Sequence, residues 1–403
     1  MRILLLSNDV PYPPNSGYRL RLYNLLYRIA KEHDIWLVTF LPEYEKLTDL
    51  DYLSSICREV VIVPLAYQGA LAKPWKAMRY FLMGNPPDLR MYDSREFAEK
   101  IRALISRIDF DIIQIEDSHM SIYLDYLPKS LRSRAILTFH DVNFQKHERL
   151  SQVEPKRARR LRLWLHGRQM RRWEPRQAQR FGHCITMSHS DKSILMNANP
   201  ALKITVLPNG VNTQDYTPLP FPANSVRLLY VGTMEYRPNI DAVTYFCRNI
   251  YPIIKEEYPN IEFWIVGKDP APEVLELEGG GVHVTGEVEN LLPYYQDSTI
   301  CVIPLRAGGG TRLKILEAMA LGRPIVSTTI GCEGLTVKDG EHLLIADTPE
   351  LFASHVLMLL KDKQKWLQLT RQARSLAVDS YDWDLIVQKH IQLYEEVVSQ
   401  NRK

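Results

Sequence analysis

Two cations follow a run of glycines where a helix is expected to begin, in the stretch GGGTRLKILEAMALGRP (308–324). The first turn of a helix carries the positive end of its dipole, so each cation there costs roughly a few tenths of a kcal/mol. Glycines let backbone N–H groups approach a ligand, and a helix start offers unpaired donors. An anionic ligand, most simply a diphosphate, would make this cluster favourable. Its expected members are Gly309, Gly310, Thr311, Arg312 and Lys314.

A carboxylate follows on the same helical side, because Glu317 lies three residues after Lys314. Such a group could accept hydrogen bonds from two vicinal hydroxyls, as on a ribose. We expect the helix to end at Gly322, with Pro324 opening the next strand. The apolar side of the helix is expected to consist of Leu313, Leu316 and Ala320. The competing interpretation is a solvated basic helix start with a Lys/Glu surface pair.

The elements that position these residues are short apolar runs separated by helical patterns. Such runs, joined by helices, indicate parallel strands buried on both faces. We therefore predict an α/β protein with two doubly wound, Rossmann-like domains. The expected strands are 2–7, 34–40, 60–63, 111–116, 135–140, 183–188 and 203–208 in the first half, and 227–233, 261–267, 282–286, 299–304, 324–328 and 342–346 in the second.

A proline-rich stretch without periodicity, residues 212–225, reads as the linker between the two domains. The predicted organisation is an N-terminal domain over 1–211 and a C-terminal domain over 226–380. The final segment, 381–403, is expected to contain a terminal amphipathic helix.

Composition limits the class of protein. The chain has 403 residues, 45% hydrophobic, and a net charge of +3, which by itself does not indicate a nucleic-acid partner. Five scattered cysteines fit a reducing compartment without structural zinc. No apolar run reaches the roughly 18 residues that span a bilayer, and the N-terminus lacks the pattern of a signal peptide. A cytoplasmic protein is expected, with contact to a membrane surface left open.

Ligands of doubly wound sheets bind beyond the carboxyl ends of the strands, so the cleft between the two domains is the expected site. Several candidate residues follow expected strands and come from both halves of the chain. They are Gly17, Glu116, His119, His140 and Gly232.

At this point the chain resembles the family 4 glycosyltransferases of the GT-B fold. The resemblance is carried by LEAMALGRPIVST with DGEHLLIADTPE (339–350), by PNGVN (208–212), by the first βα unit and by RLLYVGTMEYRPNIDAV (227–243). It covers almost the whole chain in the expected order, and it implies that the helix of the final segment, 381–403, returns to pack on the N-terminal domain. It implies sugar transfer from a nucleotide-sugar donor to an acceptor, with retention of configuration and no bound metal or other cofactor.

The resemblance also assigns roles to individual residues. Glu317 matches the second acid of the family's E-x7-E motif, which holds the donor ribose, whereas the first acid is replaced by Gly309. Its backbone N–H, with that of Gly310, could replace part of the lost sugar contact. The family's cations after the first strand of the second domain are missing at Gly232, so Arg312 and Lys314 are expected to take over the diphosphate.

The acceptor side is less specified. His140 matches a histidine near the donor sugar and acceptor, while Glu116 and His119 are weaker candidates. Gly17 would bring the first loop close to the phosphates. The acceptor, whether lipid-linked sugar, glycan or small molecule, stays open, as does the sugar; synthesis of a bacterial polysaccharide or glycoconjugate is the expected role.

Other activities remain as alternatives. A nucleotide-sugar epimerase shares the two-domain architecture, and Gly309 also supports a catalytically silent binding module. A metal-dependent transferase needs a D-x-D motif just after an apolar strand, and the three D-x-D matches of this chain do not fit that position.

A basic segment over 155–180 carries ten Lys and Arg residues against Glu174, with Leu161, Trp164, Leu165 and Trp173 interleaved. This pattern suits an anionic phospholipid surface on the inner face of a membrane. No nucleic-acid-binding module is recognised. The competing interpretation is a solvated helix whose aromatic residues pack inward.

Overall fold

The computed structural model describes residues 1–42, 50–65, 74–222, 226–309 and 312–402. They form two compact units. The N-terminal unit comprises Met1–Glu148, Leu161–Asn209 and Trp383–Lys403, and the C-terminal unit comprises Arg149–Arg160 and Gly210–Asp382. The division falls inside two helices, α7 (Asn143–Val153) and α8 (Arg157–Ala178), so these helices carry residues of both units.

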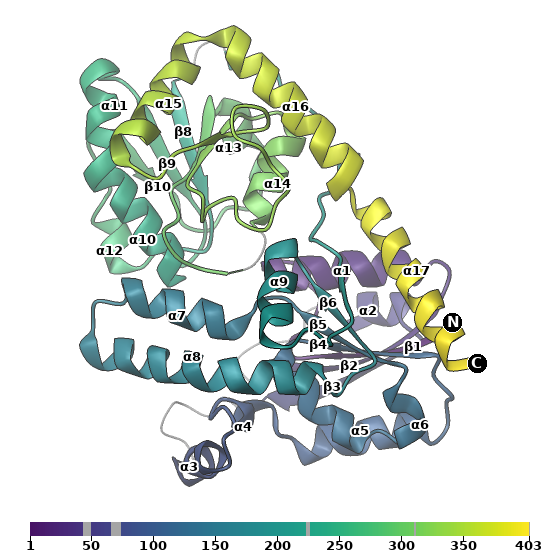
Figure 1. Cartoon of the computed structure of the whole chain (residues 1–403). Helices are drawn as coiled ribbons and strands as arrows, with labels where there is room; N and C mark the ends of the chain where they lie inside the picture. The colour runs from purple at the N-terminus through teal and green to yellow at the C-terminus, as the bar shows by residue number, and fades with distance from the viewer. Residues whose placement is uncertain (43–49, 66–73, 223–225, 310–311, 403) are drawn as a thin grey trace. The chain divides into compact units, whose positions relative to one another are not determined.

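A sheet of parallel strands forms the centre of the N-terminal unit (Figure 1). In its described residues the order is β3-β2-β1-β4-β5-β6-β7, which is that of a doubly wound sheet. The strands are β1 (Arg2–Ser7), β2 (Asp34–Pro42), β3 (Glu59–Leu65), β4 (Ile112–Glu116), β5 (Ala135–Phe139), β6 (His183–Thr186) and β7 (Ile204–Val206).

Successive residues of these strands face opposite sides of the sheet, and both sides are covered. Leu4 and Leu6 pack into one apolar cluster, whereas Ile3 and Leu5 pack into the other with Trp383 of the C-terminal helix. The helices of this unit are α1 (Gly17–Ile29), α2 (Leu50–Ile56), α3 (Pro74–Leu82), α4 (Leu89–Tyr92), α5 (Arg95–Ile105), the 3₁₀ helix η1 (Ser118–Tyr126), α6 (Lys129–Arg132), α9 (His189–Ala198) and α17 (Trp383–Arg402).

The C-terminal unit repeats this design. Its described strands are parallel in the order β10-β9-β8-β11-β12-β13. They are β8 (Arg227–Val231), β9 (Glu262–Val266), β10 (Val282–Val284), β11 (Ile300–Ile303), β12 (Ile325–Ser327) and β13 (Leu344–Ile345). The helices are α10 (Arg237–Tyr245), the π-helix η2 (Phe246–Ile250), α11 (Tyr251–Glu257), α12 (Pro272–Leu275), α13 (Leu292–Asp297), α14 (Leu313–Ala320), α15 (Pro349–Lys361) and α16 (Lys363–Tyr381).

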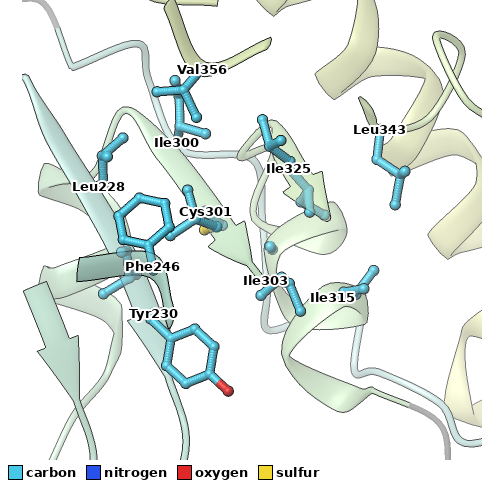
Figure 2. Packing of buried hydrophobic residues seen from close by; sticks show 14 of the residues in the cluster. Leu228, Tyr230, Phe246, Ile300, Cys301, Ile303, Ile315, Ile325, Leu343 and Val356 are labelled. Carbon is cyan, nitrogen blue, oxygen red and sulfur yellow. The ribbon is translucent and has the colours of Figure 1, made fainter. Parts of the chain in front are cut away.

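The core of the C-terminal unit fixes α14 against the sheet. Figure 2 shows Ile315 of this helix in the same buried cluster as Tyr230 of β8 and Ile303 of β11. The helix is more deeply buried than the sequence predicts. Leu316 and Ala320 are buried as expected, but so are Ile315, Ala318 and Met319, while Leu313 is only partly buried.

The predicted fold class is confirmed, because each expected strand is present in a parallel sheet. The strand order reverses between β1 and β4 in one unit and between β8 and β11 in the other. Ligands of open α/β sheets bind beyond the strand ends at such switch points. Among the described helices, none combines the length and apolar character needed to cross a bilayer.

Candidate functional site

The loops after β8 and β11 meet at the start of α14. Gly232 directly follows β8, and a Cβ there would lie 2.8 Å from Asn239 Nδ2 and 2.9 Å from Lys314 Nζ. These distances are too short for a real side chain. A glycine at this position therefore leaves the space into which Asn239 and Lys314 both reach.

Lys314 has one polar partner, Asn239, and one aromatic partner, Tyr230. Its Nζ donates to Asn239 Oδ1 at 3.3 Å and lies 3.9 Å from the centre of the Tyr230 ring. Asn239 is itself fixed, because its Nδ2 donates to Thr233 O at 2.8 Å and the Tyr230 hydroxyl donates to its Oδ1 at 2.7 Å. Burial, reinforced by the charge of Arg312, lowers the pKa of Lys314 to about 7.

Arg312 occupies the N-cap position of α14, where it offers no side-chain cap. It is only 9% exposed, and its Nη1 donates to Gly309 O. Its Nε and Nη2 are buried without a hydrogen-bond partner among the described residues. Gly308 approaches closely, since its φ is +118° and a Cβ would lie 3.1 Å from Arg312 Nη2. Unused donors on a buried cation mark a place for an anion.

Glu317 lies one helical turn further on. The hydroxyl of Tyr295 donates to its Oε2 at 3.1 Å, and burial raises the pKa of Glu317 to about 7. As predicted, the helix ends at a glycine in the left-handed region, Gly322, with a φ of +65°. The structure thus places Gly232, Gly309, Arg312, Lys314 and Glu317 around the start of α14, while the predicted contacts of Gly310 and Thr311 lie outside the described residues.

In the N-terminal unit the structure joins two of the predicted acceptor-side residues. Glu116 ends the buried strand β4, and His140 follows β5, its neighbour in the sheet. His140 Nε2 lies 2.6 Å from Glu116 Oε2, and Thr138 Oγ1 donates to Glu116 Oε1 at 3.2 Å. Burial opposes ionisation of Glu116, but the bond to His140 outweighs it and lowers the pKa of this carboxyl.

This pair is supported from outside the strands. The Tyr18 ring of α1 lies 4.4 Å from the His140 ring, centre to centre. Gln114 donates to Glu116 and accepts from the Tyr394 hydroxyl, which brings the C-terminal helix α17 into the same network. Such a network fixes one ring nitrogen of His140 and the plane of its imidazole.

The other two predicted residues of this unit are His119 and Gly17. His119 in η1 bonds to Asp117 and Asp88, with its Nδ1 2.6 Å from Asp117 Oδ1 and its Nε2 3.0 Å from Asp88 Oδ2. Burial disfavours its charged form, but the two carboxylates outweigh this and raise the pKa of His119 well above its ordinary value. Gly17 opens α1 and is exposed; its predicted approach to phosphates stays a prediction.

Sequence reasoning missed several of the residues that support these clusters. Asn239 lies in the segment RLLYVGTMEYRPNIDAV (227–243), but its contacts with Tyr230 and Lys314 depend on how α10 and α14 pack. Tyr295 and Gln114 sit in apolar patterns that indicate only burial. A buried polar residue within an apolar strand was the available signal for Gln114, because such a group requires a partner.

The basic segment forms α8, and its apolar residues divide between the core and solvent. Trp173 is 4% exposed, as the inward-packing interpretation requires. Leu161 is 57%, Trp164 41% and Leu165 48% exposed, which contradicts that interpretation for the first half of the helix. Arg168 stacks on Trp164, with its guanidinium carbon 4.5 Å from the ring centre.

The burial of Lys314 gives a pH-dependent prediction. Its folded pKa of about 7 lies below the ordinary 10.5, so the unfolded chain binds more protons between these pH values. Stability should therefore rise with pH in this window for the wild type relative to Lys314→Met. From about pH 8 to pH 10 the difference should grow by at most about 1.4 kcal/mol per pH unit. Urea unfolding at each pH measures the difference in free energy of unfolding between the two proteins. Parallel pH profiles would contradict a lowered pKa of Lys314.

Two family profiles and several known proteins match this chain. Residues 225–362 match the family profile of "Glycosyl transferases group 1", and residues 52–215 match that of "Glycosyltransferase Family 4". An uncharacterised 44.6 kDa protein in the cps region of Klebsiella pneumoniae is 23% identical, over 94% of this chain and 96% of its own.

Solved structures show the same fold at low identity. Sucrose-phosphate synthase from Thermosynechococcus elongatus has a TM-score of 0.73 at 18% identity and covers 99% of this chain and 100% of its own. Anabaena HepE, solved with UDP and glucose, has a TM-score of 0.65 at 16% identity and covers 98% of this chain and 100% of its own. With one family profile matching each half and two parallel Rossmann-like sheets in place, the chain belongs to the family 4 glycosyltransferases of the GT-B fold.

Proposed function

We propose that this glycosyltransferase takes its sugar from a nucleotide-sugar donor that binds at the start of α14. The observation that carries the proposal is the buried guanidinium of Arg312, whose Nε and Nη2 lack partners among the described residues, beside the partly buried ammonium of Lys314. A diphosphate offers acceptor oxygens to both cations and to the N–H groups at the helix start. The UDP complexes of the structurally similar HepE support the same class of donor.

The remaining residues of this cluster suit the other parts of such a donor. The Glu317 carboxylate is one helical turn from Lys314 and can accept hydrogen bonds from vicinal ribose hydroxyls. Gly232 leaves open space where a side chain would collide with Lys314. At position 309 a glycine replaces the family's first acid, so we assign the contact with the sugar hydroxyls to backbone N–H groups there.

The proposed chemistry is neutralisation of the leaving group. As the bond from the sugar to the diphosphate breaks, negative charge grows on the diphosphate, and fixed cations stabilise that charge. In our proposal Arg312 and Lys314 supply this stabilisation without a metal at the donor site, and the sugar is transferred with retention. His140, oriented by Glu116 at 2.6 Å, would contact the donor sugar or acceptor.

Synthesis of a surface polysaccharide or glycoconjugate is the proposed role. The full-length similarity to a protein of the Klebsiella cps region supports it. Similarity over about half of the chain to a component of the human phosphatidylinositol N-acetylglucosaminyltransferase agrees with a glycoconjugate acceptor.

The donor proposal predicts which substitutions weaken binding. Glu317→Ala and Lys314→Ala each remove a charged hydrogen-bonding partner worth roughly 1.5–3 kcal/mol, so affinity should fall about 10- to 150-fold. Isothermal titration with UDP-, GDP- and ADP-sugars measures it. Lys338→Ala is the matched control, since this lysine belongs to the same unit and its side chain is 71% exposed.

The same titrations and a product assay separate the alternatives. Unchanged affinity in both variants, with folding intact, would remove the donor site from α14. Donor consumption without an acceptor, with the sugar released free, would favour an epimerase-type reaction. Binding without any turnover, across a panel of lipid-linked and free glycan acceptors, would favour the silent binding module.

We further propose that the exposed face of α8 docks on the anionic, cytoplasmic face of a membrane. Leu161, Trp164 and Leu165 are exposed apolar side chains on a helix that is rich in arginine. Arginines next to interfacial aromatic residues suit anionic headgroups, and each basic residue near the surface contributes about 1 kcal/mol. The helix α3 also exposes apolar residues, with Trp75 61% and Phe81 53% exposed.

Membrane docking predicts binding that depends on charge and salt. Vesicles rich in anionic lipid should co-sediment with the protein, neutral vesicles should not, and high salt should release it, because screening shortens to about 3 Å at 1 M. Changing Arg157, Arg159, Arg160 and Arg162 to Gln should abolish sedimentation and leave donor affinity unchanged. A quadruple Gln variant with the same charge change on α5 and the loop after it, at Arg95, Lys100, Arg102 and Arg107, is the control. Equal sedimentation with neutral and anionic vesicles would refute this proposal.

A further inference from the structure

Three side chains that the proposed function does not use converge in the N-terminal unit. Asp88 precedes α4, His147 belongs to α7 and His166 belongs to α8. Each offers one donor atom, and these atoms all lie within 4.8 Å of one another. The two imidazole rings also pack together, with their centres 4.3 Å apart. The cluster therefore joins three helices that are separate in the sequence.

The polar atoms of this cluster are unsatisfied. Asp88 Oδ1, His147 Nδ1 and His166 Nε2 are each buried without a hydrogen-bond partner among the described residues. His166 Nε2 lies 3.2 Å from Asp88 Oδ2, close enough for an ion pair when the imidazole is protonated. Buried polar groups are nearly always paired, because an unpaired group loses its hydration without compensation. Such atoms on three residues whose candidate ligand atoms lie within 4.8 Å of one another indicate a missing common partner.

We propose that Asp88, His147 and His166 bind one divalent transition-metal ion, with Zn²⁺ the best match. Two imidazoles and one carboxylate form a common three-ligand zinc set, which leaves a fourth position for water. Ligand atoms at the usual zinc distances lie roughly 3.4 Å from one another. The candidate ligand atoms of these three residues lie within 4.8 Å of one another, so small side-chain rotations bring them to this spacing. Imidazole ligands disfavour Mg²⁺ and Ca²⁺, which prefer oxygen.

The surroundings of the carboxylate support the assignment. His119 Nε2 lies 3.0 Å from Asp88 Oδ2, and its Nδ1 lies 2.6 Å from Asp117 Oδ1. Asp88 is thus oriented through one oxygen, while the other, Oδ1, has no partner among the described residues. Partners that fix a ligating carboxylate in this way are typical around bound metals. In this proposal His119, the weaker acceptor-side candidate of the sequence, acts as a positioning residue for Asp88.

A metal at this point would be independent of the proposed donor site. The proposed donor cluster belongs to the C-terminal unit and Asp88, His147 and His166 belong to the N-terminal unit, so the inference does not depend on the proposed function. Binding would fasten α8 and α7 to the start of α4. The exposed apolar residues of α8 precede His166 on the same helix, so metal loss would loosen the surface proposed for membrane docking.

The test uses full-length, tag-free protein that has been treated with chelator and dialysed. Titration with Co²⁺ alone should give visible absorption bands at one equivalent, and Zn²⁺ should displace them and raise the melting temperature. His147→Ala and His166→Ala should each weaken Zn²⁺ binding more than about tenfold in isothermal titration. The matched control is His189→Ala, because His189 is an exposed histidine of the same unit.

Asp88→Asn keeps the shape of the side chain and provides a second test if a histidine variant fails to fold. It should lose Zn²⁺ affinity while the circular dichroism spectrum and the donor affinity stay those of the wild type. Absence of stoichiometric Co²⁺ and Zn²⁺ binding to the wild type would overturn the proposal. Equal affinity in the wild type and in all three variants would overturn it as well, because the ion would then bind elsewhere on the surface.

Discussion

The C-terminal unit is organised around two cations at the positive end of a helix, one buried and one partly buried. Arg312 is 9% exposed at the N-cap of α14, and Lys314 lies against Tyr230 and Asn239 in the first turn. Burial, the helix dipole and mutual repulsion all disfavour this arrangement in the free protein. Binding of an anion would offset this unfavourable energy. Gly232 and Gly308 provide the space for the two cations.

The parallel sheets make such a site possible. In each unit the strand order reverses beside the first strand, so loops from two neighbouring strands separate there and helix starts face the gap. α14 is fixed in this position because Ile315, Leu316 and Met319 are buried in the core below it. In the N-terminal unit Glu116 ends β4, which borders the reversal, and His140 follows the next strand, β5. The two are joined at 2.6 Å and supported by Gln114.

The sequence predicts the fold well because strands buried on both faces require long apolar runs, and all of the predicted runs form strands. It also predicts the glycines and cations of α14, since a Gly-rich helix start is a local pattern. It does not predict Asn239, Tyr295 or the cluster of Asp88, His147 and His166, because these contacts arise between elements distant in the chain. The half-exposed apolar residues of α8 could not be assigned to core or surface for the same reason. Periodicity gives a face, and tertiary packing decides what covers it.

The proton balance of donor binding tests the central claim most directly. A bound diphosphate should restore the charge of Lys314, whose pKa is about 7 in the free protein. At pH 8 binding should therefore take up roughly one proton, while a nucleotide-sugar diphosphate itself has no group titrating near that pH. Calorimetry in buffers of different ionisation enthalpy measures the uptake. The account predicts about one proton for the wild type and none for Lys314→Met, and donor binding without proton uptake by the wild type would contradict it.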